Sequence, residues 1–171
     1  RVNTDLKYHG NITSFAIAAA PVGEGLVNTY PEVEKSVRIT PALNIRFRRG
    51  NDILSENNTY YTESSIFDIF TFPMIYGDFK TSLKDPNSIV ITESIAKKYF
   101  NRTNVVGQTL LLATDSSVHK ITGVIRDIPV QSHFKADFFL HLTRPTDTRW
   151  NNISPFSTYI LLKPGPDYKR L

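Results

Sequence analysis

Residues 87–110, NSIVITESIAKKYFNRTNVVGQTL, carry the signals of a strand, a helix and a turn in one short stretch. Residues 88–91 are mostly β-branched and apolar, which predicts a buried strand. Thr92 is a residue type that caps helices, and Asn101 ends the helix that follows. The apolar face of this helix would be formed by Ile95, Ala96, Tyr99 and Phe100. The stretch has no obvious catalytic residue, so it predicts an ordered structural unit.

The rest of the chain alternates irregularly between strands and short helices. One helix is predicted from Pro21 to a point before Pro31, and a short one is predicted over residues 66–70 with Thr62 or Ser64 as its cap. Strands are predicted over residues 12–19, 33–47 with an interruption at Pro41, 59–63, 88–91, 108–113, 118–128, 134–142 and 157–162. This order of elements predicts a mixed α+β fold in layers.

Length and composition describe a globular chain without cysteine chemistry. The 171 residues correspond to one domain, or to two small ones sharing a core. The absence of cysteine excludes a Cys-based zinc site and a thiol nucleophile. The most apolar run, residues 14–27, is too short to cross a bilayer. The chain begins with Arg1, and we expect it to be a piece of a longer protein.

The net charge of +4 is spread along the chain, with one concentrated patch in the segment NIRFRRG. In an extended strand Arg46 and Arg48 would lie on one face, and Ile45 and Phe47 on the other. Together with Arg49, these arginines predict either a solvated strand face or a contact with a phosphate, a lipid or a partner protein. A nucleic-acid binder would carry a denser basic stripe with stacking aromatics, so we exclude that class.

His133, Asp137 and His141 are the sharpest candidates for catalysis or metal binding, because imidazoles and carboxylates ligate zinc. Residues four apart in a strand, however, are separated by about 13 Å and do not converge on one ion. We therefore predict a polar strand face there, and no metal or other cofactor in this chain. No nucleophile elbow and no Gly-rich phosphate loop occurs, so the sequence does not predict an enzyme.

Aromatic residues are concentrated between positions 60 and 76. They predict either a satellite core under the short helix or a surface that binds a partner. The residues concerned are Tyr60, Tyr61, Phe67, Phe70, Phe72 and Tyr76.

Four segments, in this order, resemble the periplasmic core domain of MacB-like ABC transporter permeases, the FtsX-related group. They are NTYPEVEKSVRI, YYTESSIFDIFTFPMIYGDF, SIVITESIAKKYF followed by VVGQTLLL, and ITGVIRDIPVQSHFKADFFLHL. The resemblance covers nearly the whole chain, and it is to family members of the Bacteroidetes type.

The resemblance implies a two-part periplasmic domain. Residues 1–55 and 145–171 would form a porter-like subdomain of two β-α-β units, and residues 56–144 would form an inserted, sabre-like α/β subdomain. The family continues with a helix and a last strand where this chain ends, so the second β-α-β unit would be incomplete. Residues 87–110 would then be scaffold in the inserted part.

For function, the resemblance implies an extracytoplasmic domain that relays ATP-driven conformational change to a periplasmic substrate or partner. ATP would be hydrolysed by a cytoplasmic ATPase, the parent permease would be a homodimer or heterodimer in the inner membrane, and a periplasmic adaptor or lipoprotein is a further expected partner. Efflux, lipoprotein handling and peptide handling all occur in the family. The alternative hypothesis is an extracytoplasmic ligand-sensing domain of a membrane receptor.

Overall fold

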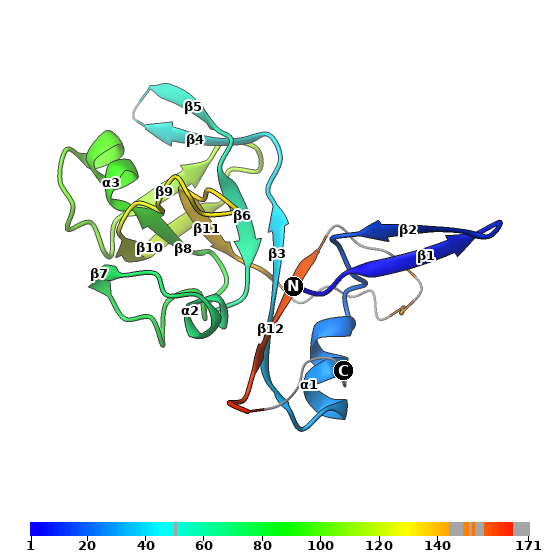
Figure 1. Cartoon of the computed structure of the whole chain (residues 1–171). Helices are drawn as coiled ribbons and strands as arrows, with labels where there is room; N and C mark the ends of the chain where they lie inside the picture. The colour runs from blue at the N-terminus through cyan, green and yellow to red at the C-terminus, as the bar shows by residue number, and fades with distance from the viewer. Residues whose placement is uncertain (50, 144–148, 151, 153–155, 166–171) are drawn as a thin grey trace. The chain divides into compact units, whose positions relative to one another are not determined.

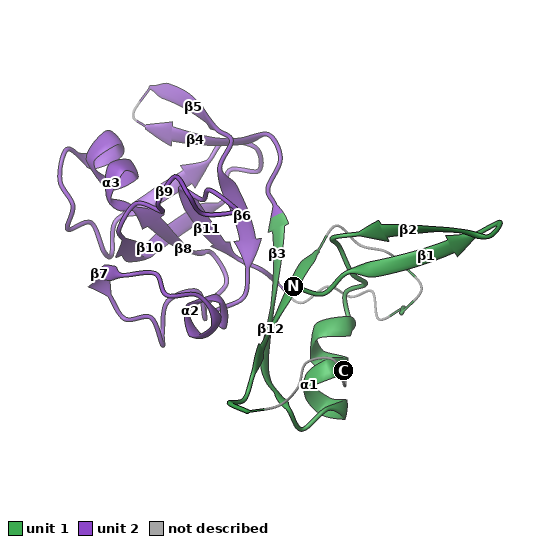
Figure 2. Ribbon diagram, viewed as in Figure 1, with its two compact units in different colours: residues 1–40, 144–171 green, residues 41–143 purple. Residues whose placement is uncertain are grey.

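A computed structural model describes residues 1–49, 51–143, 149, 150, 152 and 156–165 (Figure 1). The chain divides into two units, residues 1–40 with 144–171 and residues 41–143 (Figure 2). Both units combine strands with helices, so the predicted mixed α+β class is confirmed. Residues 41–55, which the family resemblance assigns to the porter-like part, lie in the second unit because β4 pairs with β9 and with β5.

The second unit is a mixed sheet with two helices. The strands lie in the order β6-β11-β8-β10-β9-β4-β5, and β7 also pairs with β10. The elements are β4 (Ile45–Arg49), β5 (Asp52–Glu56), β6 (Thr59–Thr62), α2 (Ile66–Ile69), β7 (Met74–Gly77), β8 (Ser88–Thr92), α3 (Glu93–Phe100), β9 (Thr109–Leu112), β10 (Val118–Ile125) and β11 (Phe138–His141).

The stretch 87–110 explains the topology of this sheet. β8 and β10 are parallel neighbours, and parallel strands need a crossover connection, which α3 supplies. All five residues of β8 are buried, as the apolar run predicts. Ile95, Ala96 and Tyr99 of α3 are buried in the same core, so strand and helix pack as one body.

The start of α3 differs from the expectation in one respect. Thr92 occupies the N-cap position with extended backbone angles, but its side chain makes no capping hydrogen bond. Instead, Asp127 accepts hydrogen bonds from Ser94 N at 3.0 Å and from Ser94 Oγ at 2.5 Å, although it lies 33 residues after Ser94 in the chain. The carboxylate thus satisfies a free N–H of the first helical turn and ties α3 to the segment after β10. At the other end, Asn101 stops the helix in the left-handed conformation.

Aromatic side chains cover both faces of the sheet at β11. Phe138 stacks on Phe47 of β4 with ring centroids 4.7 Å apart, and Tyr99 meets both rings edge-on. Phe139 points to the opposite face, where it contacts Phe67 and Phe72. The prediction of a polar face here is wrong, because the α2–β7 segment forms a second apolar layer over it.

Other boundaries also differ from those predicted. β11 begins at Phe138 rather than at residue 134, and α2 begins after Ser65, which makes no side-chain cap. Strands β1, β5 and β7 were not predicted. β1 is almost entirely exposed, and β7 has only four residues.

In the first unit, β3 (Val33–Pro41) pairs antiparallel with β12 (Ser157–Leu162), and α1 (Val22–Thr29) packs near them. Gly23 allows the close approach of α1, since a Cβ there would lie 3.0 Å from Ser36 Oγ and 3.2 Å from Thr158 Cγ2. Strands β1 (Thr4–Tyr8) and β2 (Asn11–Phe15) form a separate hairpin. Among the described residues, no helix is both long and apolar enough to span a membrane.

Candidate functional site

The three candidate metal ligands lie in separate environments. Asp137 Oδ2 accepts a hydrogen bond from Asn58 Nδ2 at 2.9 Å, and His141 Nδ1 lies 2.7 Å from the carbonyl oxygen of Leu83. His133 lies outside β11, with its ring against Phe70. Within the described part of the chain, no group of three or more His, Cys, Asp or Glu side chains is placed to hold a metal ion. Of the three candidates only His141 lies in β11, because the strand starts at Phe138.

The arginine strand is observed as β4, and its predicted alternation is confirmed. Ile45 and Phe47 are buried, whereas Arg46 and Arg48 are exposed. Arg49 is different, because its Nη1 donates to the carbonyl oxygen of Lys98 at 2.7 Å and its Nη2 lies 3.8 Å from Asp52. Arg49 thus binds the last turn of α3, where a cation is favoured by the helix dipole.

Strand register extends the arginine face across four strands. Arg48 pairs with Ile53 of β5 and Leu111 of β9, and Leu111 pairs with Val118 of β10. Ile53 and Val118 are exposed apolar residues. The exposed Lys120 lies two positions from Val118 and therefore on the same face. This outer face thus combines a short apolar row with cations, an arrangement that no single segment of the sequence contains.

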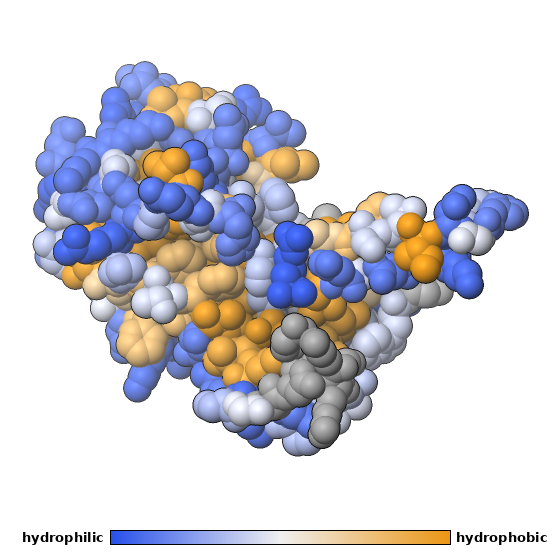
Figure 3. Space-filling view, viewed as in Figure 1, coloured by the Kyte–Doolittle hydropathy of each residue, from blue (hydrophilic) through white to orange (hydrophobic). Residues whose placement is uncertain are grey.

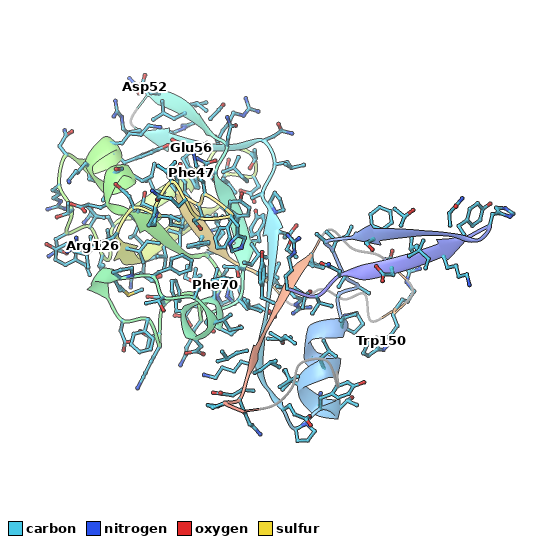
Figure 4. All side chains as sticks on the ribbon, viewed as in Figure 1. Phe47, Asp52, Glu56, Phe70, Arg126 and Trp150 are labelled. Carbon is cyan, nitrogen blue, oxygen red and sulfur yellow. The ribbon has the colours of Figure 1, made fainter. Side chains whose placement is uncertain are left out.

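A buried carboxylate lies on the opposite side of β5. Glu56 Oε1 accepts hydrogen bonds from Lys98 Nζ at 2.7 Å and from Tyr99 Oη at 2.6 Å (Figure 4). Burial, followed by the hydrogen bond to Glu56, raises the pKa of Tyr99 well above its usual value of 10.0. The cluster joins β5 to α3 through a buried carboxylate, so we interpret it as structural.

The Tyr99→Phe variant should lower stability and change its dependence on alkaline pH. Loss of the hydroxyl removes a hydrogen bond to a charged acceptor, which costs about 1.5–3 kcal/mol. Above pH 10 Tyr99 ionises in the unfolded chain but keeps its proton in the folded chain. The free energy of unfolding of the unsubstituted chain therefore falls with rising pH. The variant should show a shallower fall in the free energy of unfolding between pH 10 and 11. Identical slopes would contradict this role for the hydroxyl.

The one hollow we take as a candidate binding site lies in the second unit, between the α2–β7 segment and the segment after β10. It has a volume of about 680 Å³. Figure 3 shows apolar surface over the part of this unit that contains α2 and β7. The hollow is lined by Phe70, Thr71, Phe72, Pro73, Arg126, Asp127, Ile128, Pro129, Gln131, Ser132 and His133.

The aromatic residues near the hollow divide into two groups. Phe67 contacts the buried Phe139, which agrees with the satellite-core alternative. Phe70 contacts Phe134 with centroids 5.5 Å apart and lines the hollow. Phe72 contacts both Phe139 and Phe134 and so belongs to both groups. Sequence clustering located the aromatic segment, but Arg126 and Ile128 join it only through the fold.

Three solved structures are similar to this chain. A domain of a protein described as a permease, from Porphyromonas gingivalis, is 26% identical with a TM-score of 0.80, covering 92% of this chain and 74% of that one. The periplasmic region of MacB from Actinobacillus actinomycetemcomitans is 13% identical with a TM-score of 0.59, covering 90% and 69%. The extracellular domain of the noncanonic ABC-type transporter YknZ from Gram-positive bacteria is 11% identical with a TM-score of 0.58, covering 85% and 74%.

The fold is thus that of the extracytoplasmic domains of transporter permeases. The sequence profile of the MacB-like periplasmic core domain matches residues 5–171, and the chain belongs to that family. No curated protein sequence matched the chain. The resemblance seen in the sequence is confirmed, and membership favours the permease over the receptor hypothesis. Domains of this family are parts of membrane-bound permeases and are not themselves enzymes.

Proposed function

We propose that this chain is the periplasmic domain of an ABC-type permease of the inner membrane, and that it relays ATP-driven conformational change to a substrate or partner outside. The observation that carries the proposal is the family match over residues 5–171. A relay of this kind needs a stiff body rather than a nucleophile. β8, with Ile89, Val90 and Ile91 fully buried, supplies such a body together with α3.

Three contacts support the stiffness of this body. The Asp127 carboxylate ties the start of α3 to the segment after β10. Glu56 ties the last turn of α3 to β5 through Lys98 and Tyr99. Closely packed interiors transmit displacement because they deform little. Both ends of α3 are therefore held to the sheet and move with it.

The proposed partners follow from the family. A cytoplasmic ATPase subunit would hydrolyse ATP, and the parent permease would assemble as a homodimer or heterodimer. A periplasmic adaptor or a lipoprotein would bind on the outer side. We keep Arg46 and Arg48 as the proposed contact, with Lys120 added from the strand register. Arg49 contributes less to this proposed contact, because its guanidinium already donates to the Lys98 carbonyl oxygen.

Affinity purification of the parent protein from its native membranes tests the proposal. We expect a cytoplasmic ATPase to elute with the parent, in amounts comparable to it. A parent in which the exposed Phe79 is replaced by alanine is purified in parallel. It should retain the same ATPase, so it controls for losses during purification. An eluate without any ATPase, from a parent that carries a signalling domain on the same chain, would replace the relay with the receptor hypothesis.

A further inference from the structure

The hollow in the second unit has an apolar wall and a single cationic group at its edge. Phe70, Phe72 and Ile128 supply apolar lining, and Arg126 supplies the charge. We infer that this hollow binds a small amphipathic anion, an aryl carboxylate in its simplest form. Neither the family match nor the proposed relay assigns such a site, and the inference does not depend on the relay.

The walls of the hollow are fixed by contacts between its two chain segments. The Arg126 N–H donates to the carbonyl oxygen of Pro73 at 2.9 Å, which joins the segment after β10 to the start of β7. Phe70 lies against His133 and Phe134, with ring centroids 6.0 Å and 5.5 Å apart. The hollow therefore exists before any ligand binds, and a ligand need not order these segments.

The titratable side chains that line the hollow are Arg126, Asp127 and His133. Asp127 keeps its negative charge, but its two carboxylate oxygens accept hydrogen bonds from the backbone and side chain of Ser94 at the start of α3. Arg126 is exposed, and no hydrogen bond or ion pair engages its guanidinium among the residues that the structure describes. A guanidinium offers paired N–H donors that match a carboxylate. The unoccupied N–H donors at the hollow are therefore those of Arg126, and they favour a carboxylate.

The volume of the hollow and its aromatic lining indicate the apolar part of the ligand. The volume of about 680 Å³ is within the range of sites for small molecules. Phenylalanine rings pack well against another ring in stacked or edge-on arrangements. A ligand with several negative charges would need more cations than the single arginine provides. An aryl group bearing one carboxylate fits both the ring lining and the charge of Arg126.

Binding of two probes of equal shape and opposite charge tests the inference. The probes are 2-naphthylacetate and 2-naphthylmethylammonium, added to the 171-residue chain and followed by NMR chemical-shift changes. We expect the acetate to shift backbone amides of Thr71, Phe72 and residues 126–128 and 130–133, and to bind at least about tenfold more tightly than the ammonium. Equal affinities, no binding, or shifts confined to other parts of the chain would overturn the inference.

Three variants separate the charge effect from a loss of folding. Arg126→Gln should weaken binding of the acetate by about tenfold. Gln131→Glu adds a negative charge at an exposed lining position, so it should weaken the acetate and strengthen the ammonium. Arg102→Gln removes an exposed arginine that does not line the hollow, and should leave both affinities unchanged. An Arg126→Gln variant that binds the acetate as tightly as Arg102→Gln does would contradict the role of Arg126.

Discussion

Replacement of Phe138 by alanine is expected to lower the free energy of unfolding of the second unit by about 3–5 kcal/mol. Phe138 is fully buried and stacks on Phe47, with Tyr99 packed edge-on against both rings. The substitution leaves a cavity between β4, β11 and α3 that their backbones can only partly close. Because whole domains are stable by only about 5–15 kcal/mol, this loss is a large fraction of the total.

Hydrogen exchange of the β8 amides measures this effect where it occurs. β8 pairs with β11, so its amides should exchange faster in Phe138→Ala to the extent that the unit opens. The sole tryptophan, Trp150, belongs to the other unit, so its fluorescence does not report unfolding of the second unit. Phe79→Ala is the matched control, since this phenylalanine is exposed and should cost less than about 1 kcal/mol. Equal exchange in the two variants would contradict the core assignment.

Gly77→Ala is the second substitution expected to be severe. Gly77 ends β7 with φ +96°, a conformation that L-residues rarely adopt. An added Cβ would lie 2.5 Å from Thr122 O and 2.9 Å from Gly123 Cα, both in the backbone of β10. Backbone strain of about 1–2 kcal/mol and overpacking of about 1–3 kcal/mol then act together. β7 would have to separate from β10.

Gly107→Ala isolates the backbone contribution. Gly107 has φ +88°, close to the value at Gly77, but nothing lies within 4 Å of its added Cβ. We expect Gly107→Ala to cost only the strain of about 1–2 kcal/mol, and chemical denaturation should show Gly77→Ala to be less stable by at least about 1 kcal/mol more. Equal losses in the two variants would show that the close approach of β7 and β10 is wrong.

The sequence predicts best the elements whose residues are buried by their neighbours along the chain. Residues 88–100 combine an apolar strand with an amphipathic helix, and both were placed nearly to the residue. β4 was also predicted with the correct faces, because alternation of arginine with apolar residues is a local signal. Two of the strands that were not predicted carry a weaker signal, since β1 contributes almost nothing to a buried core and β7 has only four residues.

The features that define the candidate sites depend on residues far apart in the chain. Asp127 completes the first turn of α3 in place of Thr92, and Lys98 and Tyr99 find Glu56 across more than forty positions. The hollow combines an aromatic segment with Arg126 from a different strand end. Local pattern does not specify such pairings, because they follow from strand order and register. For the same reason the spacing of His133, Asp137 and His141 carried no information about a site.

On the proposed relay, ATP binds on the cytoplasmic side of the membrane and thereby changes the position of this domain, which lies on the opposite side. The chain has no cysteine, so Thr114→Cys, in the exposed turn after β9, provides a single position for a spin label within this domain, and cysteines elsewhere in the parent would be replaced by serine. The assembled parent would carry one label on each of its two extracytoplasmic domains, and the distance between labels would be measured by pulsed electron spin resonance. We predict that trapping ATP on the ATPase subunits shifts the distance distribution, and that an ATPase unable to bind ATP abolishes the shift. A distribution unchanged by ATP would contradict the relay.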